Sequence, residues 1–127
     1  MKLFTLILFI AFSSQAYAQC FVVGDLKGHS ARENENFEVI DDAISGQKFI
    51  IEINGENSSV TPNDMSCLEV SVNSLMCFSQ ASDKKSTVET WTVYPSNNKV
   101  VYTKAINGYG VFDGGKLLVG SVKGRCE

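Results

Sequence analysis

The sequence has few of the residues that most enzymes and metal proteins need. It contains one histidine, four widely spaced cysteines and no Gly-x-Ser-x-Gly segment. A zinc site normally needs paired cysteine or histidine ligands a few residues apart, and an α/β-hydrolase needs the glycine-flanked serine. We therefore predict no metal ligand, no cofactor and no catalytic residue, and we expect that the protein is not an enzyme.

The single histidine, His29, is the side chain through which any histidine-dependent mechanism would have to run. It lies in a polar stretch, residues 25–30, whose glycine predicts a loop. A histidine general base acts on a nucleophile and is oriented by a third group, and the sequence identifies neither. We interpret His29 as a solvated loop residue.

Basic residues are also in deficit, with 11 Lys and Arg against 14 Asp and Glu. Nucleic acids and anionic lipids are bound largely by neutralising their phosphates, so an acidic balance argues against both as partners. Residues 33–42 contain no cation and carry Glu33, Glu35, Glu38, Asp41 and Asp42. This acidic segment is interpreted as a solvated face, with a site for a basic partner as the alternative.

The first 18 residues have the three parts of a secretory signal peptide. Lys2 is followed by an apolar run, residues 3–12, and by the small-x-small triplet Ala16-Tyr17-Ala18. The run is too short to cross a bilayer, which takes about 20 residues. We predict cleavage after Ala18, a single domain over residues 19–127, no membrane span, and a secreted or periplasmic location. Loss of Lys2 would change the formal net charge from −3 to −4.

The four cysteines, Cys20, Cys67, Cys77 and Cys126, favour two disulfides in an exported chain. Four cysteines allow three connectivities. If Cys67 faces Cys77 in an antiparallel hairpin, their apolar neighbours, such as Leu68 and Met76, share the opposite face of the hairpin. This register favours a Cys67–Cys77 disulfide, which leaves Cys20 and Cys126 to join the two ends of the domain.

Apolar and polar residues alternate after residue 48, and turn residues interrupt them, which is the pattern of short strands. Asn54-Gly55 and Asp113-Gly114 are strong hairpin signals. In residues 32–44 the apolar residues have helical spacing, which predicts either a short helix or an irregular lid. Residues 79–86 are expected to form a loop. The strands are expected at 21–23, 49–53, 88–94, 99–106, 110–112 and 116–122 and in the hairpin around Cys67 and Cys77. The predicted fold is all-β, a small antiparallel barrel or sandwich of six to eight short strands.

Three functions are compatible with such a domain. The first is a non-catalytic binding or inhibitory module for another macromolecule, with a cationic secreted protein as the expected partner. The second is a carrier of a small apolar ligand in a barrel cavity lined by Trp91 and Tyr102, although aromatic residues on strands more often pack in a core. The third is a small enzyme that uses His29 or a pair of carboxylates. Asn57-Ser58-Ser59 is a triplet that accepts N-glycosylation, and the oligomeric state is left open.

Overall fold

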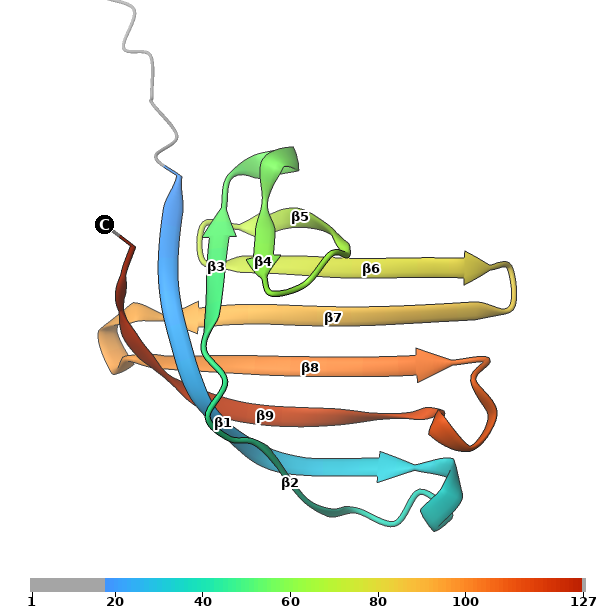
Figure 1. The fold of residues 1–127 in the computed structure, drawn as a ribbon. Helices are drawn as coiled ribbons and strands as arrows, with labels where there is room; N and C mark the ends of the chain where they lie inside the picture. The colour runs from blue at the N-terminus through green and yellow to red at the C-terminus, as the bar shows by residue number, and fades with distance from the viewer. Residues whose placement is uncertain (1–17, 127) are drawn as a thin grey trace, which may run out of the picture.

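Residues 18–126, the part of the chain that the computed structural model describes, form one antiparallel sheet that curls on itself (Figure 1). Neighbouring strands follow the order β4-β3-β1-β9-β8-β7-β6-β5, and β2 pairs with β1. The strands are β1 (Gln19–Arg32), β2 (Ile40–Ile44), β3 (Phe49–Ile53), β4 (Ser59–Thr61), β5 (Ser66–Ser71), β6 (Ser74–Ser82), β7 (Lys85–Tyr94), β8 (Lys99–Asn107) and β9 (Gly114–Arg125). The end strands β4 and β5 contact each other, so the sheet makes a nearly closed barrel.

The all-β antiparallel prediction is confirmed, with nine strands instead of six to eight. The helical segments of residues 18–126 are four 3₁₀ turns of three residues each, η1 (Glu33–Glu35), η2 (Gly55–Asn57), η3 (Pro95–Asn97) and η4 (Gly110–Phe112). None of the helices in this range is long and apolar enough to cross a membrane. The predicted signal peptide lies outside the described residues, except for Ala18.

Strand β1 is the longest strand and the largest departure from the sequence-based expectation. It was expected as a short strand at 21–23 followed by a loop at 25–30, but it runs for 14 residues. Its first part pairs with β3, its last part pairs with β2, and its other edge pairs with β9 along most of its length. Two register shifts against β9 and a positive φ of 56° at Asp25 interrupt the alternation of side chains. This irregularity is why the segment resembles a loop in sequence.

The helix considered for residues 32–44 is replaced by η1 and β2. Ile40 and Ile44 have the spacing of one helical face, but four residues apart is also the same face of a strand. Phe37, the third member of that pattern, is exposed and has a positive φ of 57°. Strand pairing with β1 therefore prevails over the weak helical pattern.

Two further segments differ from the prediction. Residues 79–86 were expected to be a loop, but β6 and β7 extend into this segment and leave a tight turn at Asp83-Lys84. Residues 110–112 were expected to be a strand, but they form η4, and β9 begins at Gly114 and pairs with β8 and β1. The ends of β6 and β7 are polar and lack the alternation of apolar and polar residues that indicates a strand. Their extension into residues 79–86 was therefore not predicted.

The inward-facing side chains of neighbouring strands line up in rows across the sheet. The apolar row, from β6 to β9, consists of Leu75, Trp91, Tyr102 and Leu118, none of which is more than 4% exposed. The ionic row lies two residues further along the strands and runs from β7 to β2. It consists of Glu89, Lys104, Lys116, Ser30 and Ile40. The barrel interior thus changes from apolar to charged over one side-chain repeat, about 7 Å.

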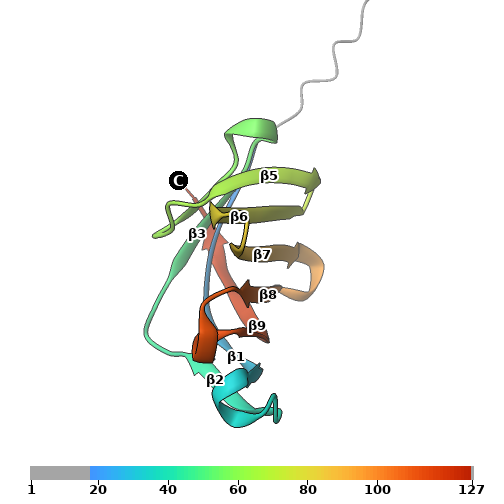
Figure 2. The same ribbon diagram turned by 90° about the vertical axis from the view of Figure 1, so that its right-hand side faces the viewer.

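These rows define two ends of the barrel (Figure 1). The closed end lies beyond the apolar row and contains both chain ends. The open end lies beyond the ionic row, where β6 to β9 extend past β3 and β4 and where η1 and η4 lie. Figure 2 shows the curved sheet from this side. A hydrogen bond of 2.9 Å from the Glu33 N–H to the Asp113 carbonyl joins η1 to η4.

Two disulfides connect the strands, in the arrangement that the hairpin register favours. Cys20 is bonded to Cys126, which joins β1 to the end of β9 at the closed end. Cys67 is bonded to Cys77 across β5 and β6, with 4.0 Å between their Cα atoms. Both sulfur-bearing side chains of the second pair face the interior, and Cys77 is directly opposite Glu89.

Candidate functional site

A pocket of about 410 Å³ opens on the concave face of the sheet, where the apolar row meets the ionic row. We call it the Glu89 pocket. Strands β6, β7 and β8 supply its floor, and the other walls come from the β2–β3 segment and from the connection between β4 and β5. It is lined by Ile44, Phe49, Pro62, Asn63, Asp64, Met65, Ser79, Thr87, Glu89, Trp91, Tyr102 and Lys104.

Aromatic side chains form the apolar part of this pocket. The Trp91 ring packs between Phe49 and Tyr102, with ring centroids 5.1 and 4.4 Å away and both pairs tilted by 48°. Tilted pairs at these distances are favourable beyond the area that they bury. Trp91 is 1% exposed, so the stack is part of the core and at the same time one wall of the pocket. The sequence offered core packing and a cavity wall as alternatives, and the structure combines them.

The Glu89 carboxylate is buried at the centre of the site. Its Oε1 accepts a hydrogen bond of 3.1 Å from the Tyr102 hydroxyl and lies 3.6 Å from Lys104 Nζ. Its Oε2 accepts from Asn63 Nδ2 at 3.1 Å and from Trp91 Nε1 at 3.4 Å. Four neighbouring donors occupy nearly all the acceptor sites of a carboxylate, which number about four. Glu89 therefore acts as the hub that orients the surrounding side chains.

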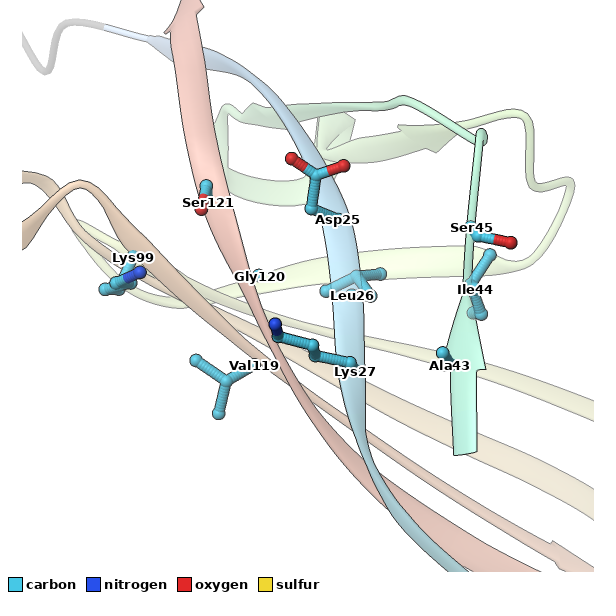
Figure 3. Close-up of a pocket in the computed structure, with 10 residues that line it drawn as sticks. All are labelled: Asp25, Leu26, Lys27, Ala43, Ile44, Ser45, Lys99, Val119, Gly120 and Ser121. Carbon is cyan, nitrogen blue, oxygen red and sulfur yellow. The ribbon is translucent and has the colours of Figure 1, made fainter. Parts of the chain in front are cut away.

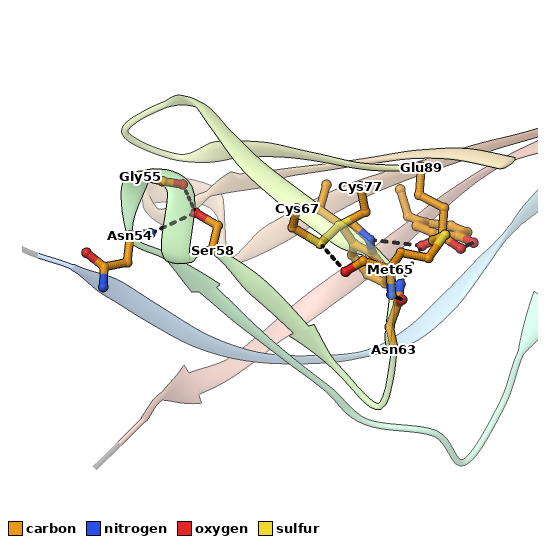
Figure 4. The surroundings of a disulfide bond; sticks show 10 residues. Asn54, Gly55, Ser58, Asn63, Met65, Cys67, Cys77 and Glu89 are labelled. Atoms are coloured by element: carbon orange, nitrogen blue, oxygen red, sulfur yellow. Dashed lines mark hydrogen bonds between the residues drawn. A yellow bond between two sulfur atoms is a disulfide. The ribbon is translucent and has the colours of Figure 1, made fainter. Parts of the chain in front are cut away.

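The connection between β4 and β5 is tied to this hub. The Asn63 side chain accepts a hydrogen bond of 2.7 Å from the Met65 N–H and donates to Glu89, so it bridges the connection and the sheet. Figure 4 shows Asn63, Met65 and Glu89 gathered beside the Cys67–Cys77 disulfide. The disulfide fixes the β5–β6 hairpin on one side of the pocket, and Asn63 fixes the connection between β4 and β5 on the other.

Burial and the neighbouring Glu89 carboxylate raise the pKa of the Tyr102 phenol far above its ordinary value. Both effects act against a phenolate, because it would place a second negative charge in a poorly solvated site. Tyr102 is therefore a neutral hydrogen-bond donor throughout the physiological pH range. It can hold Glu89 in position, but it cannot supply a base.

A larger groove, about 580 Å³, crosses the outside of β1 near its irregular segment (Figure 3). Its charged residues are exposed, and the Asp25 carboxylate already binds Lys123. The hydrogen bond and the charge of Lys123 lower the pKa of Asp25. None of the charged side chains that line this groove is buried, so the Glu89 pocket is the better candidate despite its smaller volume.

The structure places His29 on strand β1, not in a loop, and away from the Glu89 pocket. Its Nδ1 lies 3.2 Å from Asp41 Oδ1, and both side chains are mostly exposed. The solvated part of the interpretation agrees with this position, whereas the loop does not. Among residues 18–126, moreover, no group of three or more potential metal-ligating side chains is close enough to hold an ion.

The acidic segment does not present five free carboxylates. Asp41 is paired with His29, and Asp42 Oδ2 lies 3.5 Å from Arg32 and 3.4 Å from Lys116. The surface that exposes apolar side chains is instead the convex face of the sheet, with Leu68, Phe78, Val88, Leu117 and Val119. An apolar face does not match the cationic macromolecular partner that was expected, and that partner stays a prediction.

Asn57, the first residue of the acceptor triplet, ends η2 and is exposed. The next residue, Ser58, is buried. Its hydroxyl accepts a hydrogen bond of 2.9 Å from the Asn54 N–H and donates one of 2.7 Å to the Gly55 carbonyl (Figure 4). Ser58 thereby shapes the connection between β3 and β4, which is the hairpin that Asn54-Gly55 predicted.

Glu89 and Lys104 were not identified from the sequence, although a signal for both was present. Residues 89, 91 and 93 share one face of β7, so Glu89 lies on the same face as Trp91. On β8, Lys104 shares a face with Tyr102 in the same way, and the hairpin register places it opposite Glu89. A carboxylate and a lysine on the inward faces of paired strands indicate a buried polar site.

Comparisons with known proteins give no relative for this chain: no protein-family model, no curated protein and no solved structure matches it. The assignment of the site therefore depends on its geometry and chemistry.

Proposed function

We propose that the protein is an exported, non-catalytic binding protein whose Glu89 pocket holds a small ligand with an apolar or aromatic body. The observation that carries this proposal is a pocket of about 410 Å³ that combines an aromatic wall with a few fixed polar groups. Small-molecule sites have this volume and this composition, and they often lie in the mouths of β-barrels.

The chemistry of the polar groups supports binding over catalysis. Glu89 is surrounded by donors, and Tyr102 is held neutral, so neither is free to move a proton to or from a ligand. A general base needs an available acceptor site and a pKa near the working pH. His29, which a histidine mechanism would require, does not line the pocket. These groups suit the role of a rigid, polar floor against which a ligand is oriented.

The two disulfides support export. Disulfides persist in oxidising compartments such as the periplasm and the extracellular space. Together with the predicted signal at residues 1–18, they favour a secreted or periplasmic location for the proposed binding protein.

The proposal can be tested with N-phenyl-1-naphthylamine, an uncharged aromatic probe that fluoresces in apolar surroundings. Trp91 is the single tryptophan of the chain, so quenching of its emission by energy transfer reports binding close to the pocket. We expect saturable probe fluorescence with one site per protein, accompanied by quenching of Trp91.

Two substitutions on the same strand provide the matched control. Thr87→Phe fills the pocket and should weaken probe binding by about tenfold or more, equivalent to about 1.4 kcal/mol. Thr90→Phe adds the same ring to the convex face and should leave the affinity unchanged. If the probe fails to bind, or if both variants lose affinity equally, the Glu89 pocket is not a ligand site.

A further inference from the structure

A second hollow, of about 210 Å³, adjoins the Glu89 pocket and shares Lys104 with it. We call it the lysine hollow. Its charged lining residues are Lys104, Lys116 and Arg32, and no carboxylate is among its lining residues. The positive charge of this hollow contrasts with the negative net charge of the whole protein.

Two cations of the hollow lie directly opposite each other on neighbouring strands. Lys104 on β8 and Lys116 on β9 are direct cross-strand partners, so their Cβ atoms are about 5 Å apart on one face. Like charges in this arrangement destabilise a sheet. Both lysines are largely buried, with 28% and 18% of their side chains exposed. Solvent can therefore screen their repulsion only in part.

The cations are paired with carboxylates but keep part of their hydrogen-bonding capacity. Glu89 is 3.6 Å from Lys104, and Asp42 is 3.4 Å from Lys116 and 3.5 Å from Arg32. A short charge-assisted hydrogen bond would measure about 2.7–2.9 Å. Three cations thus share two carboxylates, and each cation retains N–H donors for another acceptor.

The surroundings of Asp42 favour its ionised form, as the direction of its pKa indicates. Its burial alone would raise that pKa, but the Ala43 N–H and the nearby Lys116 ammonium outweigh burial and hold the pKa below its ordinary value. The Ala43 N–H and Lys116 therefore keep Asp42 ionised.

A buried hydroxyl lies beside the lysines. Ser30 is the direct cross-strand partner of Lys116 and is 4% exposed. Its Oγ makes no hydrogen bond of normal geometry to the described residues, although it lies close enough to Asp42 to contribute to the lowered pKa of that carboxyl. The Ser30 hydroxyl therefore retains hydrogen-bonding capacity on the side of the cations.

Two glycines, Gly114 and Gly115, line the hollow. A Cβ atom on Gly114 would lie 2.1 Å from the Ala31 carbonyl oxygen, and the φ of 142° also favours glycine. Glycine at this position therefore lets β9 pack closely against β1 beside the cations. The remaining lining residues, Ile106 and Phe112, are apolar and stand at the rim.

We infer that the ligand is a small amphipathic anion whose carboxylate, sulfonate, sulfate or phosphate group binds between Lys104, Lys116 and Arg32. The inference rests on the proposed function, since the apolar body of this ligand occupies the Glu89 pocket. The anion separates the two opposed ammonium groups and accepts hydrogen bonds from both of them and from the Ser30 hydroxyl.

The test compares two probes that share one skeleton. N-phenyl-1-naphthylamine is neutral, whereas 8-anilino-1-naphthalenesulfonate carries a sulfonate on the same ring system. We expect the sulfonate to bind about tenfold more tightly at low ionic strength. Inorganic sulfate should displace the anionic probe and leave the neutral probe bound.

Variants assign the effect to individual residues. Lys116→Met and Arg32→Met should each reduce the affinity for the anionic probe about fivefold and leave the affinity for the neutral probe unchanged. Ser30→Ala should weaken binding of the anionic probe with little change in melting temperature, because the Ser30 hydroxyl makes no hydrogen bond of normal geometry to the described residues. Lys84→Met, in the exposed β6–β7 turn, is the control for loss of one positive charge.

The outcomes separate this inference from the proposed function. If both probes bind with equal affinity, the lysine hollow is not an anion site, although the Glu89 pocket still binds ligand. If Lys84→Met weakens the anionic probe as much as Lys116→Met, the effect is one of net charge and the inference is wrong. If neither probe binds to the folded protein, the proposed function fails first.

Discussion

At the closed end of the barrel the inward-facing side chains are apolar and almost fully buried, whereas at the open end the same strands direct charged side chains inward. Leu118 and Lys116 illustrate the contrast, since they are two residues apart on β9 and face the same interior. Apolar burial gives about 25 cal/mol per Å², while a half-solvated ion pair contributes about 0–1 kcal/mol. Stability is therefore concentrated at one end of the barrel and binding chemistry at the other.

The open end can carry charged side chains in its interior because the closed end supplies most of the stability. An interior made only of apolar rows would be more stable, but it would have no polar group to orient a ligand. The two disulfides and the apolar row maintain the geometry in which Glu89 and the lysines are held. The following predictions test this division, from the largest expected effect to the smallest.

Removing the disulfide of the closed end should have the largest effect. Replacing Cys20 and Cys126 by serine opens a cross-link between residues 106 positions apart, which should lower the free energy of unfolding by about 4.7 kcal/mol. The corresponding change at Cys67 and Cys77, 10 positions apart, should cost about 3 kcal/mol. Urea unfolding at neutral pH measures both values. A larger loss from the shorter cross-link would contradict the assignment of stability to the closed end.

The two ends should also differ in their response to a shortened apolar side chain. Leu118→Ala removes a fully buried side chain from the apolar row and should cost about 3 kcal/mol. Ile106→Ala, at the rim of the lysine hollow, shortens a half-buried side chain and should cost about 1 kcal/mol. Comparable losses in urea unfolding would show that the open end is packed as tightly as the closed end.

Tyr102 should make the protein sensitive to alkali. Its pKa is raised in the folded state by burial and by Glu89, so the folded protein keeps the phenol protonated while the unfolded chain ionises above about pH 10. The stability that this group contributes is present below that pH and is lost as the pH rises, by about 1.4 kcal/mol per pH unit. Unfolding measured from pH 9 to 11 should show a shallower slope for Tyr102→Phe. Identical slopes would place Tyr102 in contact with solvent.

The smallest effect is expected in acid, from Asp42 at the open end. Its lowered pKa means that the folded state holds the carboxylate more strongly than the unfolded chain does. This contribution is present above the unfolded pKa, about 3.9, and is lost as the pH falls through the lower folded pKa. Asp42→Asn should therefore reduce the loss of stability between about pH 5 and pH 2, by less than about 1 kcal/mol because the pair is partly solvated. An unchanged loss of stability in acid would show that the Ala43 N–H and Lys116 do not stabilise this carboxylate.

Local patterns in the sequence predict the hairpins well. The register that places Cys67 opposite Cys77 is the one observed, and the hairpin that places Trp91 opposite Tyr102 lies where alternation predicts it. The two strands of a hairpin are adjacent in sequence, so the local alternation of apolar and polar residues is enough to predict them. The same information is missing for β1, because its irregular backbone breaks the period of two.

The candidate site could be predicted only in part. The sequence favours core packing for Trp91 and Tyr102 and offers a cavity wall as the alternative, and the alternation along their strands also places Glu89 and Lys104 on the inner face. The contribution of Lys116 and Ser30 depends on the pairing of β9 with β8 and β1, and β1 is more than 80 residues away in the chain. Strands this far apart in sequence pair only when the whole barrel closes, so no local sequence pattern predicts which residues will face each other.

The bond between Cys20 and Cys126 also has a mechanical consequence. When a protein is pulled by its two ends, the force usually passes through the hydrogen bonds between the terminal strands, and these strands separate first. Here β1 and β9 are neighbours, and a covalent bond joins Cys20 to Cys126, close to both ends of the described residues. Tension applied to the ends would therefore pass through the sulfur atoms and bypass the sheet, so the pocket would keep its shape under load.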